Sequence, residues 1–400
     1  MAAFGLTDVR VRGFRTLRDA RFRPGAIAAI VGEPSTGKSN LLAAMWALLD
    51  PQAAPLAAED VGRDDGSSSI LIEGALGDGS SIAVEGPGDE RAAAGGGRPP
   101  VLFFPSRLRA DALVAPLGEV PASHPLAAIV RDVAERTDAD AAAAPVAPAR
   151  GLVVGLETWA AAGATGAIVL IEEPELFLPP QIQRYLYRLL RQIAATGNQV
   201  LYSTHSPALL NVVRLDELVF AERRPSVGTT LLQPEPLPAD EEFRAYSEFD
   251  SSRSELFLAR AAVLVEGLTE KLTLPFAFEA LGHDPDRERI SIVECGGKGN
   301  IPLFAKVCRA VGLPFVAVHD RDAPTGEEPS AAERELNALI ADVAGDERVE
   351  LAPDFEGVAR IHGDRRKPAR AWRRFVGVGA EGVPEPLVRV VERAVALANR

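Results

Sequence analysis

The sequence predicts an α/β protein of two domains with largely parallel strands. Short apolar runs rich in Val, Ile and Leu alternate with amphipathic stretches of helical length over most of the 400 residues. A chain of this length is typical of roughly two to three domains, and 47% hydrophobic residues are enough to fill their cores. Residues 223–243, rich in proline and acids, mark the edge of a domain, so we place the domains at 1–245 and 246–400.

Composition and charge exclude several classes of protein. No charge-free apolar run reaches the roughly 18 residues that span a bilayer, and "MAAFGLTDVRVRGFRTLRDARF" is too polar for a signal peptide. We therefore expect a cytoplasmic protein with no membrane partner. Cys295 and Cys308 are spaced for neither a disulfide framework nor a zinc site, and we expect both in the core. A net charge of -13 argues against general nucleic-acid coating, so any nucleic-acid contact needs a local basic patch.

The first domain opens with a nucleotide-binding motif. "GEPSTGKS" follows an apolar strand and precedes a helix, which is the context that a phosphate-binding loop requires. We expect this loop to bind ATP, with Lys38 on the β and γ phosphates and Ser39 on Mg²⁺. Pro34 removes one loop N–H group, which we expect to be tolerated. The residues predicted to bind the nucleotide and its Mg²⁺ are Gly32, Ser35, Thr36, Gly37, Lys38, Ser39, Asn40 and Glu172.

Two further strands supply the remaining groups of an ATPase site. "GAIVLIEEPELFLPPQ", residues 166–181, ends a strand on Glu172 and Glu173, which point to opposite sides if the chain is extended. Glu172 is then suited to the Mg²⁺ shell, and Glu173 to orienting or deprotonating the attacking water. "NQVLYSTHSP" brings His205 to a third strand end. Alone, His205 would be an ordinary strand-end residue; after the other two motifs it suits a γ-phosphate sensor.

In this order the motifs resemble the SMC/RecF-like branch of ABC-type ATPases, over roughly residues 1–222. "EEPELFLPPQ" resembles an extended Walker B motif, His205 the switch histidine, and "VRGFRTLRDARFRPGAIAAIVG" the opening β-hairpin of that branch. The resemblance implies nucleotide sandwiched between two subunits, hence a homodimer or higher homo-oligomer. Two features depart from that branch. The signature motif is at best the degenerate "ARGLVVGLE", and no Gln-loop is assigned. Both departures bear on how well nucleotide is sandwiched between two subunits.

In the second domain, acids follow apolar strands. "AAVLVEGLTEKLTLP" ends its strand on Glu266, with Glu270 four residues later, and "PFVAVHDRDA" ends on Asp320 and Asp322. A strand end with a helix-dipole acid is the simpler interpretation of the first pair alone. Together, carboxylates at one edge of a parallel sheet repel one another unless a cation neutralises them. Oxygen ligands suit Mg²⁺ or Mn²⁺, and D-x-D places both Asp side chains on one side if the chain stays extended.

The strand-end Glu and the D-x-D resemble the Toprim domain. "FDSSRSELFLARAAVLVEGLTEK" and "CGGKGNIPLF" are similar to the OLD (overcoming lysogenization defect) family of nucleases, whose members join an ABC-type ATPase to a C-terminal Toprim nuclease. The match covers essentially the whole chain, with a trimmed helical insertion expected at about 104–150. The resemblance implies Lys367 as a catalytic lysine. It also implies two metal ions, Mg²⁺ with Mn²⁺ or Ca²⁺ as alternatives, bound by Glu266, Glu270, Asp320, Asp322 and Glu356.

We interpret the chain as an ATP-binding and ATP-hydrolysing, metal-dependent DNA endonuclease or nickase, in which two metal ions about 4 Å apart promote phosphodiester hydrolysis. One alternative is a non-cleaving ATP-dependent DNA clamp or regulator with a vestigial Toprim domain, and another is an ATPase that acts on small nucleotides or RNA. The presence of all the predicted metal acids favours the nuclease. The basic segment 360–374 is the expected DNA contact, or else a solvated cationic face. The sequence does not choose between phage defence and DNA repair.

Overall fold

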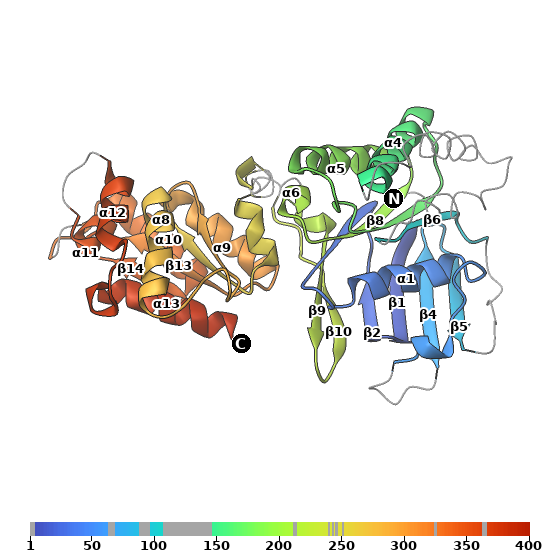
Figure 1. The fold of residues 1–400 in the computed structure, drawn as a ribbon, viewed down its shortest axis with the longest axis horizontal. Helices are drawn as coiled ribbons and strands as arrows, with labels where there is room; N and C mark the ends of the chain where they lie inside the picture. Colours follow the sequence, from blue (N-terminus) through green and yellow to red (C-terminus); the bar gives the residue numbers. More distant parts are fainter. Residues whose placement is uncertain are drawn as a thin grey trace. The chain divides into compact units, whose positions relative to one another are not determined.

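The computed structural model divides the chain into two compact units, 1–236 and 237–400, which we describe separately (Figure 1). It describes residues 5–62, 69–87, 97–106, 146–210, 214–238, 241, 244, 247–249, 252–323, 326–361 and 366–400. The predicted insertion at about 104–150 lies mostly outside these ranges, and so does Arg365 of the basic segment. None of the helices within them is long and apolar enough to cross a membrane.

The first unit contains two sheets. A four-stranded antiparallel sheet has the order β2-β1-β4-β5, and a six-stranded sheet has the order β10-β9-β3-β8-β7-β6. In the larger sheet β10 is antiparallel to β9, and the other pairs are parallel. The strands are β1 (Leu6–Phe14), β2 (Leu17–Phe22), β3 (Ile27–Val31), β4 (Ile70–Leu76), β5 (Ser81–Gly86), β6 (Val101–Phe104), β7 (Ile168–Glu172), β8 (Gln199–Thr204), β9 (Leu218–Arg224) and β10 (Gly228–Leu232).

The antiparallel sheet departs from the predicted largely parallel arrangement. Strand β4 alternates buried and half-buried residues along its length, which is the pattern of a sheet with one face on the core. Its neighbour β1 forms a hairpin with β2, in which Phe14 pairs with Leu17. The hairpin predicted to precede the phosphate loop is therefore present, and it belongs to a separate sheet from that loop.

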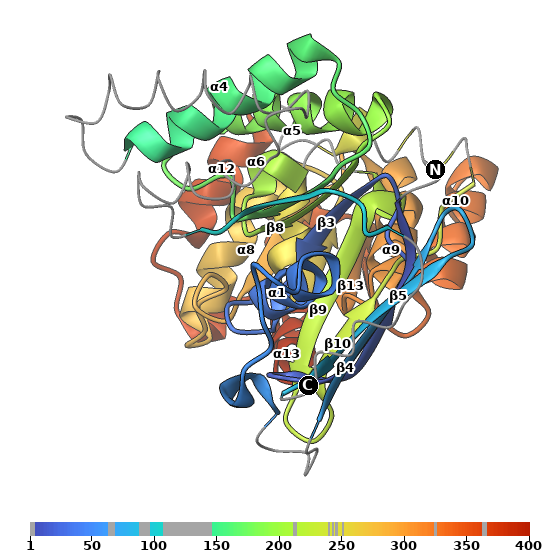
Figure 2. The same ribbon diagram turned by 90° about the vertical axis from the view of Figure 1, so that its right-hand side faces the viewer.

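Helix α1 (Lys38–Leu49) lies between the two sheets of the first unit. It contacts β1, β4 and β5 of the antiparallel sheet and β6, β7 and β8 of the larger sheet, and Figure 2 shows it beside β4, β5 and β8. Most of its residues are apolar and buried against the two sheets, whereas Ser39 in its first turn is exposed. Helix α5 (Pro180–Ala195) packs on β3 and β8, and α4 (Val146–Ala162) lies beside α5. The short helices are η1 (Ala58–Asp60), α6 (Pro207–Leu210) and η2 (Leu215–Glu217).

The second unit is built on one parallel sheet of order β12-β11-β13-β14. The last strand was not anticipated from the sequence. Strands β11 and β13 are buried along their whole length, as expected for a parallel sheet covered on both faces. The strands are β11 (Ala261–Val265), β12 (Ile290–Glu294), β13 (Phe315–Asp320) and β14 (Arg348–Leu351).

Helices cover both faces of this sheet. Alternate residues of β11 form a core with α8, α12 and α13, while Ala262 and Leu264 point to the opposite face, and α9 also contacts β11. Cys295 and Cys308 are free and buried, as predicted. The helices are η3 (Arg253–Leu258), α8 (Leu268–Ala280), η4 (Lys298–Asn300), α9 (Ile301–Ala310), α10 (Ala331–Ala344), α11 (Phe355–Ala359), α12 (Lys367–Phe375), η5 (Ala380–Gly382) and α13 (Glu385–Ala398).

Candidate functional site

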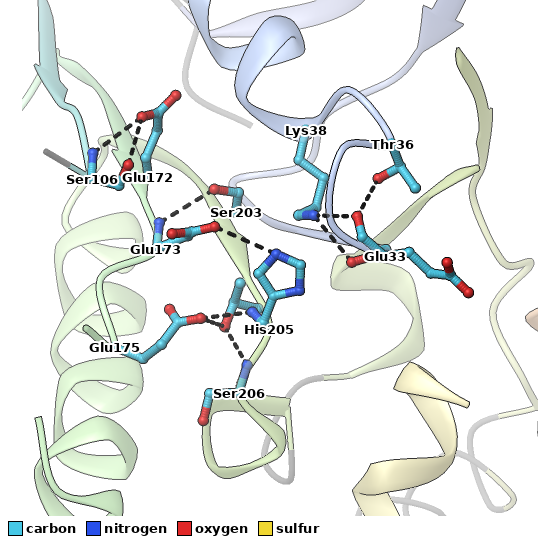
Figure 3. A network of polar contacts seen from close by, with 12 residues as sticks. Glu33, Thr36, Lys38, Ser106, Glu172, Glu173, Glu175, Ser203, His205 and Ser206 are labelled. Atoms are coloured by element: carbon cyan, nitrogen blue, oxygen red, sulfur yellow. Dashed lines mark hydrogen bonds and ion pairs between the residues drawn. The ribbon is translucent and has the colours of Figure 1, made fainter. Parts of the chain in front are cut away.

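The phosphate loop leaves the end of β3 and returns as the first turn of α1. A Cβ atom at Gly32 would lie 2.3 Å from the Ala221 carbonyl oxygen of β9, so the close approach of the loop to this strand requires glycine. Lys38 is buried, and its Nζ donates to the carbonyl oxygens of Gly32 (3.1 Å) and Glu33 (2.8 Å) (Figure 3). Burial lowers the pKa of Lys38 to about 8. The ammonium group is thus held over the loop, where phosphate oxygens would replace the carbonyls.

Neighbouring elements hold the loop in place. Thr36 Oγ1 donates to the Glu33 carbonyl (2.9 Å), and Thr229 Oγ1 of β10 donates to the Thr36 carbonyl (2.7 Å). Asn40 Nδ2 donates to Thr16 Oγ1 (2.8 Å) in the β1–β2 turn. Both hairpins therefore contact the predicted nucleotide site. Among the remaining residues predicted to bind nucleotide, Gly37 has φ 105°. Ser35 and Ser39 are exposed to solvent.

Glu172 and Glu173 face different partners at the end of β7. Glu172 Oε2 accepts from Ser106 N (3.1 Å) and Ser106 Oγ (3.3 Å), whereas Glu173 Oε1 lies 3.4 Å from His205 Nε2 (Figure 3). Glu173 has φ 44°, so the chain turns immediately after the strand, and its N–H donates to the Ser203 carbonyl (3.0 Å). The structure brings Glu173 and His205 together, and it places Glu172 against Ser106 instead. Their roles in ATP hydrolysis stay predictions.

A buried carboxylate that sequence reasoning missed supports this pair. Glu175 Oε1 accepts from His205 N (2.6 Å) and from Thr204 Oγ1 (2.9 Å), while Oε2 is buried without a hydrogen-bond partner among the described residues. Burial raises the pKa of this carboxyl group. The signal was present in the sequence, because "EEPE" carries a third acid two residues after the predicted pair. Glu175 fixes the backbone from which the His205 side chain extends.

In the second unit, predicted acids gather at the carboxyl ends of β11 and β13. Glu266 Oε1 accepts from Asp320 N (2.7 Å), and Asp320 Oδ1 accepts from Phe355 N (2.8 Å). Burial, followed by repulsion from neighbouring carboxylates, raises the pKa of Asp320 to about 8. Burial likewise raises the pKa of Glu266 and of Glu270 to about 7, with further increases from the neighbouring acids. The acids are therefore close enough to oppose one another's ionisation.

The D-x-D motif is not extended, so the condition under which both Asp side chains would lie on one side is not met. Asp322 has φ 57°. Its N–H donates to the carbonyl oxygen of Pro353 (2.9 Å), which belongs to the segment that follows β14. The turn directs Asp322 Oδ2 to Lys298 Nζ at 2.7 Å, and the same ammonium lies 2.7 Å from Glu333 Oε2. Sequence reasoning missed this lysine. Repulsion by Asp322 still contributes to the raised pKa of Asp320, so the two Asp residues share one edge.

Glu356 and Lys367 form an ion pair at the same edge. Glu356 lies in the first turn of α11, which Asp354 caps by accepting from Gly357 N (2.6 Å). Lys367 begins α12, and its Nζ lies 3.0 Å from Glu356 Oε1. Repulsion from Glu356 also helps raise the pKa of Glu270. The structure therefore groups the predicted catalytic lysine with two of the predicted metal acids.

The five predicted carboxylates are suitable ligands for a hard divalent cation, although they are not arranged around a common point in this structure. Within the described part of the chain, no three His, Cys, Asp or Glu side chains are arranged as a metal-binding group. Most of the carboxylates instead accept from a backbone N–H or pair with a lysine. Buried, mutually repelling carboxylates are stabilised in the charged form by a cation, and Mg²⁺, Mn²⁺ and Ca²⁺ prefer such oxygen ligands. Their assignment as metal ligands stays a prediction.

Two family models match separate parts of the chain. "Overcoming lysogenization defect protein-like, TOPRIM domain" matches residues 257–322, which include β11, β12, β13 and the acids at their ends. "AAA domain, putative AbiEii toxin, Type IV TA system" matches residues 153–211, which include Glu172, Glu173 and His205. An ATPase domain therefore precedes a Toprim domain, as the sequence predicted.

Curated relatives extend this similarity. The OLD nuclease of Thermus scotoductus is 36% identical over 265 residues, which cover 60% of this chain and 50% of that protein. The Old nuclease of Escherichia phage P2 is 27% identical over 165 residues, 40% of this chain and 28% of that protein. The chain thus spans half or less of the length of these relatives. The solved C-terminal region of the Burkholderia pseudomallei OLD protein covers 35% of this chain and 99% of its own length, at 16% identity and a TM-score of 0.30.

Proposed function

We propose that this chain, an ATPase–Toprim protein of the OLD family, is an ATP-dependent, divalent-metal-dependent DNA endonuclease or nickase. The observation that carries the proposal is the acidic edge of the second unit, where burial and mutual repulsion raise the pKa of Glu266, Glu270 and Asp320. Such an edge is unfavourable without a cation, and it lies on a different sheet from the phosphate loop. It is therefore suited to a second reaction rather than to ATP hydrolysis.

The acidic edge would hold the metal ions. Glu266, Glu270, Asp320, Asp322 and Glu356 are the proposed ligands of Mg²⁺, with Mn²⁺ or Ca²⁺ as alternatives. When bound, such ions would supply activation of a water and stabilisation of the leaving oxygen in phosphodiester hydrolysis. The carboxylates provide charge and orientation, and their hydrogen bonds to Asp320 N and Phe355 N fix two of them in place.

Helix α12 would bring the DNA backbone to this edge. It carries Lys367, Arg370, Arg373 and Arg374 in nine residues and contains no acid, so it is locally basic in an acidic protein. Ala371 and Phe375 anchor the helix in the core of the unit. Lys367 would donate to charge that develops on the cleaved phosphate, and its ion pair with Glu356 supports this role.

The first unit would bind and hydrolyse ATP. Lys38 and the loop N–H groups bind the phosphates, Ser39 and Glu172 hold Mg²⁺, Glu173 orients the attacking water, and His205 senses the γ phosphate. The support for this proposal is the placement of Lys38 over the loop and of Glu173 beside His205. We further propose a homodimer or higher homo-oligomer, and domains at 1–245 and 246–400.

The cellular setting that we propose is cytoplasmic, in phage defence or DNA repair. Two buried, free cysteines are in keeping with a reducing compartment. No observation on the described residues favours a DNA clamp with a vestigial Toprim domain, since each predicted metal acid is present and lies at the carboxyl edge of the sheet or in the helices that follow it.

The test is plasmid nicking by the Asp320→Asn variant in the presence of Mg²⁺ or Mn²⁺. Asparagine keeps an oxygen that accepts from Phe355 N, so the fold is preserved while the charge is lost. We expect nicking to fall by at least about 100-fold, the cost of losing a transition-state stabilising group, with ATP turnover unchanged. Asp342→Asn, on the exposed face of α10, is the matched control. Cleavage by Asp320→Asn at the wild-type rate would refute the nuclease assignment.

A further inference from the structure

Lys298 is a buried cation at the acidic edge to which the proposed reaction gives no role. Its Nζ lies 2.7 Å from Asp322 Oδ2 and 2.7 Å from Glu333 Oε2, and the residue is only 8% exposed. Both carboxylates that it contacts are reachable from solvent, with side-chain exposures of 40% for Asp322 and 34% for Glu333. The Lys298 ammonium group therefore bridges Asp322, which is a proposed metal ligand, and Glu333, which is not a proposed ligand.

The backbone fixes the position of this lysine. After β12, Cys295 N donates to the Val265 carbonyl (2.9 Å) and Gly297 N donates to the Glu266 carbonyl (2.8 Å), which ties the loop to the end of β11. Gly296 has φ 77° and Gly297 has φ 125°, conformations that glycine adopts without strain. The chain thus delivers Lys298 to the edge from the strand on the other side of β11 from β13.

Glu333 is held just as firmly on the other side of the ammonium group. It lies in the first turn of α10, and Ser330 Oγ caps that turn by accepting from Glu333 N (3.2 Å). The interaction with Glu333 does not depend on Asp322. If Asp322 were taken away by another partner, Lys298 would keep one ion pair and would not be left buried and unpaired, which is the costly state of a buried charge.

We propose that the Lys298 ammonium group neutralises the acidic edge when no metal ion is bound, and we call it the counter-cation. In this state it is a positioning residue that holds Asp322, and a divalent ion has to displace the ammonium group from Asp322 in order to bind. Glu333 retains the ammonium group when this happens. An ammonium ion and a divalent ion repel each other at a shared carboxylate, so Lys298 weakens ion binding while it keeps Asp322 in place beforehand. This inference rests on the proposed function, because it requires that the edge bind a divalent cation.

The proposal predicts the sign of two effects on Mn²⁺ affinity. Lys298→Met removes the competing charge and should tighten Mn²⁺ binding by roughly tenfold, since a unit charge a few ångströms from the ion is worth at least that much. Glu333→Gln leaves Lys298 with Asp322 as its remaining anionic partner and should weaken binding by about threefold or more. Lys298→Arg keeps the charge and should stay near wild type. A purely structural lysine predicts the reverse for Lys298→Met, because a misplaced Asp322 binds the ion less well.

The experiment is calorimetric titration of the full chain with Mn²⁺, without nucleotide, at constant pH. Lys306→Met is the matched control. Lys306 lies on α9, and its Nζ pairs with Glu241 Oε1 at 2.5 Å, an ion pair that involves none of the proposed metal ligands. Thermal unfolding of each variant reports whether the fold is intact. Glu333→Gln leaves the buried lysine in place, so it decides the proposal even if Lys298→Met does not fold.

Asp322→Asn separates this inference from the proposed function. If the lysine acts through Asp322, the gain from Lys298→Met should vanish in the double variant. One combination of results would refute the role of Lys298 while supporting the metal site. In that combination Asp322→Asn loses Mn²⁺ affinity, Lys298→Met binds Mn²⁺ as well as the wild type or less well, and Glu333→Gln shows no loss. If Asp322→Asn binds Mn²⁺ as the wild type does, Asp322 is not a ligand and the inference about Lys298 is wrong, whereas the proposed metal edge fails only if Asp320→Asn also binds Mn²⁺ as the wild type does.

Discussion

Cation binding at the acidic edge should depend steeply on pH, because the ion has to displace protons from buried carboxyl groups. The pKa of Asp320 is raised to about 8, and those of Glu266 and Glu270 to about 7. A protonated carboxyl group is a poor ligand, so affinity should rise as pH increases and level off above about pH 8. Raising the pH from 6 to 8 would strengthen binding by about 50-fold if Asp320 alone were decisive. The neighbouring acids titrate as a coupled group, so their factors do not simply multiply.

The stability of the metal-free protein should show the opposite trend. A carboxyl group whose pKa is higher in the folded state than in the unfolded chain binds more protons when folded, so its contribution to stability is lost as pH rises from about 4 through 8. The melting temperature of the metal-free chain should therefore fall between pH 6 and pH 8. Added Mn²⁺ should raise it more at pH 8 than at pH 6.

The assay is titration with Mn²⁺ at pH 6 and pH 8, in pairs of buffers that differ in ionisation enthalpy. Proton release per bound ion should lie between about one and three at pH 6, where the three carboxyl groups are mostly protonated, and should fall below about one at pH 8. Asp320→Asn should flatten the pH dependence, because it removes the group with the highest pKa at the edge. Equal affinity at both pH values, with no proton release, would show that the ion binds elsewhere or that these groups are already ionised.

Substitutions at four residues test the other candidate roles. Lys38→Ala should weaken ATP binding by at least about tenfold in calorimetry, because charge-assisted bonds to the phosphates are lost; unchanged binding would refute the phosphate-loop assignment. Glu175→Ala should lower ATP turnover by about tenfold or more without loss of ATP affinity, since His205 N loses its acceptor, whereas Glu175→Gln should restore most of the rate. Lys367→Ala should cut DNA cleavage by about 10² to 10³ with binding nearly intact, whereas Arg366→Gln should weaken DNA binding and reduce its salt slope by about one unit. Normal cleavage with weaker DNA binding in Lys367→Ala would make that lysine a tether only.

Local patterns predicted the strand ends of both sites, and long-range contacts determined the rest. The phosphate loop and Glu266 follow apolar runs, so hydrophobic periodicity was enough to place them. The conformation of Asp322 was wrong in the prediction because its left-handed backbone depends on a contact with Pro353, which belongs to the segment after an unanticipated strand. Lys298 was missed for the same reason, since its partners lie 24 and 35 residues away in the chain.

The two candidate sites belong to separate sheets with separate cores, so we expect a substitution in one site to leave the intrinsic affinity of the other unchanged. Lys38 packs on the loop after β3, and its ammonium group contacts only loop carbonyls among its described hydrogen-bond partners. Lys38→Ala should therefore leave Mn²⁺ affinity at the acidic edge within about twofold of wild type when no ATP is present, as expected for sites that share no residues and no hydrophobic core. Any loss of DNA cleavage in this variant would then report the coupling of ATP to the nuclease. If the Mn²⁺ affinity itself fell tenfold without nucleotide, the separation of the two sites would be wrong.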